Sequence, residues 1–211
     1  MRILLFSVSL FFSLNANAQF NIDLERIDSL TKNHQNLDFN FANLKTTFEE
    51  SPDKLTPHQV QILYYQSLNN KGSLWYELNT ATSFTKFKEL NFKKFVEYAE
   101  KSLQETPANF TILFLLSLSY STSKQDKNIA NKYAKKYKIV IDALMMNRNL
   151  KDPENTIELN CSTDEMMLLS LFGIDKSVYI KSTTPTIKYL LNMYQNGNEK
   201  FYIKTLYKYN L

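Results

Sequence analysis

Glycine and cysteine are scarce in this chain of 211 residues. The three glycines, Gly72, Gly173 and Gly197, lie far apart in the sequence. Dinucleotide sites and phosphate-binding loops need clustered glycines, because backbone amides must approach the phosphate oxygens closely. The sequence therefore excludes both kinds of site. Cys161 is the single cysteine, so a scaffold held by intrachain disulfides is also excluded.

Histidine and arginine are equally sparse. His34 and His58 are the only histidines, and neither has another ligand at the short spacing typical of a zinc site, so we expect no metal and no cofactor. The net charge is +4 and comes almost entirely from lysine, since only Arg26 and Arg148 follow Arg2. Lysine lacks the planar fork with which arginine reads bases and phosphates, so we expect no nucleic-acid binding.

No familiar catalytic arrangement is present. A Gly-x-Ser-x-Gly elbow is missing, and Cys161 lies on the inward face of an apolar strand, which indicates a buried, inert thiol. Residues 162–165 form a capping box that opens a helix, and we predict that Asp164 and Glu165 complement its positive end and accept one of its N–H bonds. We therefore expect no enzyme. A carboxylate-dependent hydrolase acting on envelope or dietary glycans is the alternative, because such an enzyme needs only two carboxylates.

The first eighteen residues have the organisation of a signal peptide. Arg2 supplies the positive start, an apolar run extends from Ile3 to Leu14, and the small-x-small pattern ends at Ala18. The run is too short to span a bilayer, for which about 20 residues are needed, and no later segment could do so. We expect an exported protein, periplasmic or extracellular, whose mature chain begins at Gln19.

The region from 19 to 148 has apolar residues at helical spacing. Thr56 and Gln59 form a capping box with proline at the first helical position, which predicts the start of a helix there. The other predicted helices occupy residues 22–30, 41–50, 91–105, 109–122 and 126–147, whereas the stretch from 73 to 90 could be loop and helix in either order.

The tail from 149 to 211 changes period. Residues 157–161 alternate as a short strand, and residues 162–172 form a helix that is apolar all round and so must be buried. Alternating residues on both sides of Asn196 and Gly197 predict a β-hairpin. A helix from Thr186 to Gln195 is the alternative, because a period over so few residues is ambiguous.

These patterns predict an α+β protein, mainly helical in its N-terminal part, followed by a small antiparallel β-sheet with one buried helix. We expect three parts: the signal peptide at 1–18, the helical region at 19–148, and a small α+β tail at 149–211 packed on it as one unit.

Part of the helical region resembles a tetratricopeptide repeat. The resemblance rests on Ser102, Leu103 and Pro107 at the end of one helix and on small and aromatic residues in the next two, which are Ser117, Tyr120, Ala130 and Ala134. Phe95 stands where a small residue is usual, and only about one and a half repeats are visible, whereas stable arrays need about three. We therefore expect a repeat-like helical hairpin within a mixed domain.

The mature chain as a whole resembles an uncharacterised domain-of-unknown-function family of exported bacterial proteins. The resemblance rests on Leu63-Tyr64-Tyr65, the pair of helices around Pro107, Asp164-Glu165 with the helix that Gly173 closes, and the aromatic terminal hairpin. The chain departs from the pattern at Gln66 and between residues 72 and 90. The resemblance implies no activity.

Lysines on the last predicted helix, Lys132, Lys135 and Lys136, form a possible partner surface for an acidic molecule. The expected function is that of a non-catalytic interaction or structural module of the bacterial envelope, with another envelope protein or peptide as its partner. This expectation follows from the fold by analogy, since helical hairpins of this kind present grooves to peptides.

Overall fold

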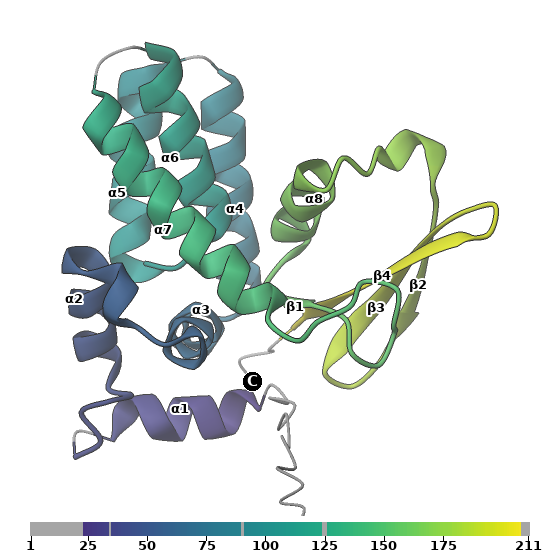
Figure 1. Cartoon of the computed structure of the whole chain (residues 1–211), viewed down its shortest axis with the longest axis horizontal. Coiled ribbons are helices and arrows are strands. Elements are labelled where there is room, and N and C mark those ends of the chain that lie inside the picture. Colours follow the sequence, from purple (N-terminus) through teal and green to yellow (C-terminus); the bar gives the residue numbers. More distant parts are fainter. Residues whose placement is uncertain (1–22, 34, 90, 124–125, 208–211) are drawn as a thin grey trace, which may run out of the picture.

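Eight α-helices and a four-stranded sheet form the part of the chain that the structure describes, which comprises residues 23–33, 35–89, 91–123 and 126–207. In this computed structural model the helices of the N-terminal part stand together, and the sheet lies to one side of them (Figure 1). The predicted signal peptide and His34 lie outside the described residues. The α+β class and the order of helices before strands are confirmed.

The helical body contains α1 to α7. Their bounds are α1 Leu24–Lys32, α2 Phe41–Glu50, α3 Pro57–Lys71, α4 Ser73–Lys88, α5 Phe92–Glu105, α6 Phe110–Ser123 and α7 Lys127–Met145, with a short 3-10 helix, η1, at Pro52–Lys54. None of the described helices is long and apolar enough to cross a membrane.

Local capping decides where these helices begin. The predicted capping box forms: the Thr56 hydroxyl accepts from the backbone N–H of Gln59, and the Gln59 side chain accepts from the backbone N–H of Thr56. Asn91 and Asp126, at which two of the predicted helices begin, cap α5 and α7. The ambiguous stretch after Gly72 forms a single helix, α4. Gly72 adopts a φ of 80° and turns the chain between α3 and α4.

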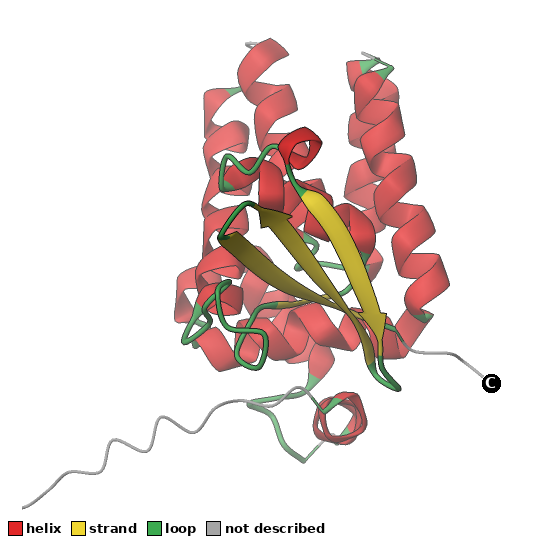
Figure 2. Ribbon diagram, turned by 90° about the vertical axis from the view of Figure 1, so that its right-hand side faces the viewer, coloured by secondary structure: helices red, strands yellow, loops and turns green. Residues whose placement is uncertain are grey.

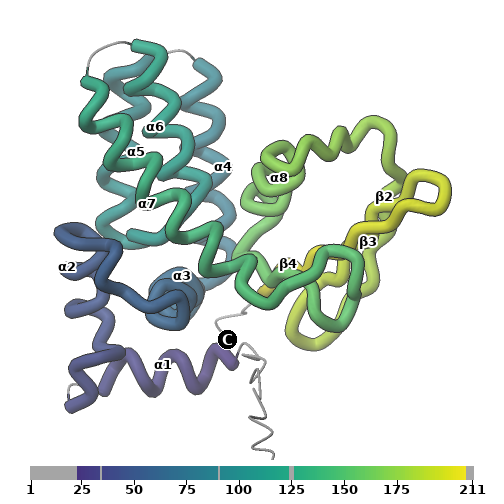
Figure 3. Tube along the Cα trace, viewed as in Figure 1, coloured from purple at the N-terminus to yellow at the C-terminus, as the bar shows by residue number. Residues whose placement is uncertain are grey.

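The core of the body lies around α3 and α6. Residues 60–68 of α3 are all buried, and α6 buries Phe110, Ile112, Leu113, Leu115 and Leu116. A helix that is covered on every side has no exposed face on which to show an amphipathic pattern, and α3 indeed includes buried polar residues such as Gln66. The tube in Figure 3 shows α3 end-on, between α1 below it and the helices α4 to α7 above it.

The tail forms α8 (Ser162–Leu171), a 3-10 helix η2 (Lys176–Val178) and the strands β1 (Glu158–Leu159), β2 (Ile180–Pro185), β3 (Tyr189–Asn196) and β4 (Glu199–Leu206). The strand order is β1-β4-β3-β2, with β1 parallel to β4 and the other pairs antiparallel. The sheet is therefore mixed, whereas the sequence predicts a purely antiparallel one. Figure 2 shows the sheet in front of the helices.

The hairpin prediction is confirmed, and the helical alternative for residues 186–195 is wrong, because these residues include β3. The face of β3 that the structure buries carries Asn192 and Tyr194, whereas Leu191 and Met193 are only half-buried on the opposite face. Polar side chains can point inward here because α8 supplies a hydrogen-bonding partner, Glu165.

The helix α8 lies between the helical body and the sheet (Figure 1). Its apolar residues Met167, Leu168 and Leu169 are buried, whereas Met166 and Leu171 are half-buried and Phe172 is exposed, so the prediction of a helix buried on all sides holds only in part. The helix ends at Leu171, and Gly173, just after its C-cap Phe172, adopts a φ of 68°, a conformation that glycine tolerates after a helix C-terminus.

Candidate functional site

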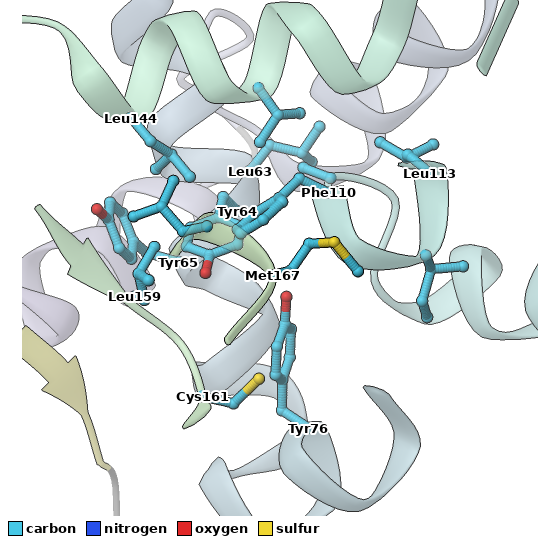
Figure 4. Close-up of a cluster of buried hydrophobic side chains, with 14 of the residues drawn as sticks. Leu63, Tyr64, Tyr65, Tyr76, Phe110, Leu113, Leu144, Leu159, Cys161 and Met167 are labelled. Carbon is cyan, nitrogen blue, oxygen red and sulfur yellow. The ribbon is translucent and has the colours of Figure 1, made fainter. Parts of the chain in front are cut away.

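The start of α8 is the most polar part of the buried interior. Cys161, not Ser162, caps this helix, and its Sγ accepts from the backbone N–H of Asp164 at 3.4 Å. The predicted capping box at Ser162 is therefore wrong by one residue. Cys161 is 2% exposed and lies among the side chains of the core cluster in Figure 4. Burial raises the pKa of its thiol well above the usual value, which disfavours the reactive thiolate.

Asp164 is fully buried and faces the helical body. Its Oδ2 accepts from the hydroxyl of Tyr64 at 2.7 Å and from that of Tyr76 at 3.2 Å, and its Oδ1 accepts from the hydroxyl of Thr111 at 2.5 Å. These three donors come from α3, α4 and α6. A single carboxylate thus joins α8 to three helices.

The environment of Asp164 opposes its ionisation. Burial raises the pKa of its carboxyl to about 6, although the hydroxyls of Thr111, Tyr64 and Tyr76 lower it in part by stabilising the anion. The same burial raises the pKa of Tyr64 and Tyr76 well above the usual value, so both hydroxyls stay protonated and act as donors.

Glu165 is 2% exposed and faces the sheet. Its Oε2 accepts from Asn192 Nδ2 at 2.7 Å and from the Thr205 hydroxyl at 2.7 Å. Its Oε1 accepts from Lys181 Nζ at 2.9 Å and from the hydroxyl of Tyr194. These donors belong to β2, β3 and β4, so this carboxylate joins α8 to the sheet.

The prediction that these two acidic side chains accept the N–H groups of the helix is therefore wrong. Asp164 and Glu165 do lie in the first turn of α8, where the helix dipole favours negative charge. Their hydrogen-bond partners, however, are side chains from other elements, far away in the sequence. The sequence did not predict that Tyr64 bonds Asp164 or that Tyr194 bonds Glu165. The one signal for a buried polar cluster was the adjacent pair of carboxylates in a helix that is otherwise largely apolar.

The three lysines of the predicted partner surface do not form one exposed patch. Lys136 is 2% exposed, forms an ion pair with Glu49 at 2.5 Å, and lies over the ring of Phe48. Lys135 is exposed and paired with Asp53, and Lys132 is exposed. Lys136 therefore serves the packing of α7 on α2 and cannot contact an outside partner.

The histidines contribute no metal site in the described part of the chain, where no group of three or more potential ligands occurs. His58 is half-buried and packs edge-on against Phe39, with ring centroids 5.8 Å apart. Burial and the nearby Arg26 charge lower its pKa, which favours the neutral ring.

A shallow and open surface region lies along one face of α5, and all of its lining residues belong to this helix. Its lining residues are Phe92, Lys93, Val96, Glu97 and Glu100, and its volume is about 510 Å³. We call this feature the α5 groove. The sequence spacing gives an indication of it, since these residues recur at intervals of three and four and so share one face of a helix. Sequence reasoning missed both of its carboxylates.

The carboxylate of Glu100 accepts hydrogen bonds from two neighbouring helices. Its Oε1 accepts from the hydroxyl of Tyr133 at 3.0 Å and from that of Tyr120 at 3.3 Å, which belong to α7 and α6. The side chain therefore has a defined position. The arrangement offers a fixed negative charge beside an apolar surface.

The comparisons with known proteins identify a family without an assigned activity. No curated protein and no solved structure matches the chain, so the resemblance to tetratricopeptide repeats stays a prediction. A family model described as Domain of unknown function (DUF4919) matches residues 25–206, which span the whole helical body and the sheet. The chain therefore belongs to the DUF4919 family.

Proposed function

We propose that this chain is a non-catalytic binding module of the bacterial envelope, and that it holds a protein or peptide partner in the α5 groove. The observation that carries the proposal is the groove itself, where Phe92 and Val96 lie beside the carboxylates of Glu97 and Glu100 on a helix packed firmly into the body. A few polar groups at an apolar surface are typical of a recognition site.

The buried polar groups of the tail support a binding role over a catalytic one. Asp164 accepts three hydrogen bonds and Glu165 accepts four from donors in the described part of the chain. Cys161 caps a helix. These groups hold layers together, and a reacting molecule would have to displace bonds on which the fold depends.

Location in the envelope is proposed from the sequence, where residues 1–18 have the organisation of a signal peptide. N-terminal sequencing of the protein recovered from the periplasm and the medium of its host tests this proposal. We expect a mature chain that begins at Gln19. Recovery of the full-length chain in the cytoplasm would contradict export.

Site-specific crosslinking in cells tests the binding role. A photoreactive amino acid replaces Val96 in the α5 groove, and in a matched control it replaces Leu37, which is 67% exposed outside the groove. We expect a discrete crosslinked species from position 96 that is missing from position 37. The same pattern of species from both positions would argue against a partner in the groove.

The α5 groove also suggests a test for the alternative, a hydrolase acting on envelope or dietary glycans. Glu97 and Glu100 line one open groove, and two carboxylates near each other are what glycoside hydrolysis requires. The assay measures the release of reducing ends from peptidoglycan and plant polysaccharides by the protein and by Glu100→Gln. Release that the substitution abolishes would replace the binding proposal with an enzymatic one.

A further inference from the structure

The α5 groove has a charge and a shape that define the chemistry of its partner. We propose that it binds an arginine side chain of a basic segment in a partner protein. This inference rests on the proposed binding function and deepens it by naming the group that is recognised.

One oxygen of the Glu100 carboxylate is available as an acceptor. Its Oε1 is held by the hydroxyls of Tyr120 and Tyr133, whereas no hydrogen bond to its Oε2 is found among the described residues. Burial and the Glu100 charge raise the pKa of both tyrosines, so the two hydroxyls remain donors and keep the carboxylate in place. A fixed carboxylate with a free oxygen is suited to a cationic donor.

Phe92, which lines the α5 groove, belongs to a row of three aromatic rings. The ring of Phe92 meets that of Tyr120 edge-on, with centroids 5.3 Å apart at 90°, and Tyr120 stacks on Tyr133 with centroids 6.0 Å apart. This row of rings fixes Phe92 beside the acidic side chains. A guanidinium group can stack on an aromatic face while it donates to a carboxylate, and its aliphatic stem can pack on an apolar side chain such as Val96.

The side chains that line the α5 groove carry a net negative charge. Two carboxylates and one ammonium group, that of Lys93, line the α5 groove, although the chain as a whole carries a net charge of +4. An anionic ligand would face the carboxylates of Glu97 and Glu100, whereas a cation finds complementary charge.

The experiment is an NMR titration of the purified protein with the blocked pentapeptide Gly-Arg-Gly-Arg-Gly. A matched peptide carries citrulline, which is neutral and nearly isosteric, at both arginine positions. We expect saturable shifts of the amides of residues 92–100 with the arginine peptide and none with the citrulline peptide. Equal shifts with both peptides, or no saturable shift with the arginine peptide at several mM, would overturn the proposal.

Three variants locate the site. Glu100→Gln still accepts from Tyr120 and Tyr133 but loses the charge, and we expect binding about tenfold weaker. Glu97→Gln changes an exposed side chain, so it tests the charge even if the first variant folds poorly, and we expect binding about threefold weaker. Glu50→Gln removes one exposed charge on α2 and is the control, with unchanged affinity. Equal affinity in all three variants would overturn the assignment.

The outcome separates the two proposals. A discrete crosslink from position 96, together with indifference to the arginine peptide, would refute arginine recognition and leave the binding role standing. If no discrete crosslinked species forms from position 96, the binding role itself is contradicted.

Discussion

The carboxylates of Asp164 and Glu165, which are neighbours in the sequence, accept hydrogen bonds from opposite sides of α8. Successive residues of an α-helix point about 100° apart, so one side chain reaches the helical body and the next reaches the sheet. Asp164 bonds donors on α3, α4 and α6, and Glu165 bonds donors on β2, β3 and β4. The pair is therefore a polar link between the two layers of the molecule.

The buried carboxyl of Asp164 gives a pH dependence to stability. Its pKa is raised from 3.8 to about 6 in the folded state. The folded state therefore binds this proton more tightly, and the resulting stabilisation is complete below about pH 4 and is lost as the pH rises through about 6. Relative to Asp164→Asn, we expect the protein to lose about 3 kcal/mol of unfolding free energy between about pH 4 and pH 7.5. Urea unfolding of both proteins at the two pH values measures this difference. Parallel pH profiles would contradict it.

Removal of the Glu165 carboxylate should weaken the attachment of the sheet. Glu165→Ala leaves the donors of Asn192, Tyr194 and Thr205 buried without their acceptor, and we expect a cost of about 3–5 kcal/mol in unfolding free energy. Hydrogen exchange should accelerate at the amides of β2 and β3 before those of α3. The control, Glu154→Ala, alters an exposed side chain and should stay within about 0.5 kcal/mol. Equal effects of the two substitutions would exclude the proposed link.

The lysines of α7 should differ sharply in their contribution to stability. Lys136→Ala removes a buried stem from Phe48 and a partner from Glu49, so we expect a loss of about 2–3 kcal/mol. Lys135→Ala removes an exposed ion pair with Asp53 and should cost less than about 1 kcal/mol. Denaturant unfolding of the two variants gives the comparison, and similar losses would show that Lys136 is not a packing residue.

The thiol of Cys161 should be unreactive until the protein unfolds. It is buried and its pKa is raised, so a thiol-reactive dye should label it only in denaturant. Because the chain has one cysteine, the labelling reports this residue alone. Cys161→Ser keeps a capping acceptor and Cys161→Ala removes it, so we expect the alanine variant to be the less stable of the two by about 1 kcal/mol. Rapid labelling of the native protein would contradict a buried cap.

Part of the α5 groove could be predicted from the sequence. The spacing of Phe92, Val96 and Glu100 places them on one face of a helix that Asn91 caps, and both the helix and its cap are confirmed. The hydroxyls that fix Glu100 come from Tyr120 and Tyr133, 20 and 33 residues away. Sequence spacing alone does not specify which residues of separate helices meet, so the preorganised carboxylate could not be predicted.

The sequence by itself determined the local elements, because the signals for them lie within a few residues of one another. Thr56 and Gln59 start α3, and the turn at Asn196 and Gly197 joins β3 to β4. Only the tertiary structure decided which face of β3 is buried and what Asp164 and Lys136 do. Their partners are distant in the chain, and a buried polar group is stable only where the fold brings a donor or a counter-charge to it.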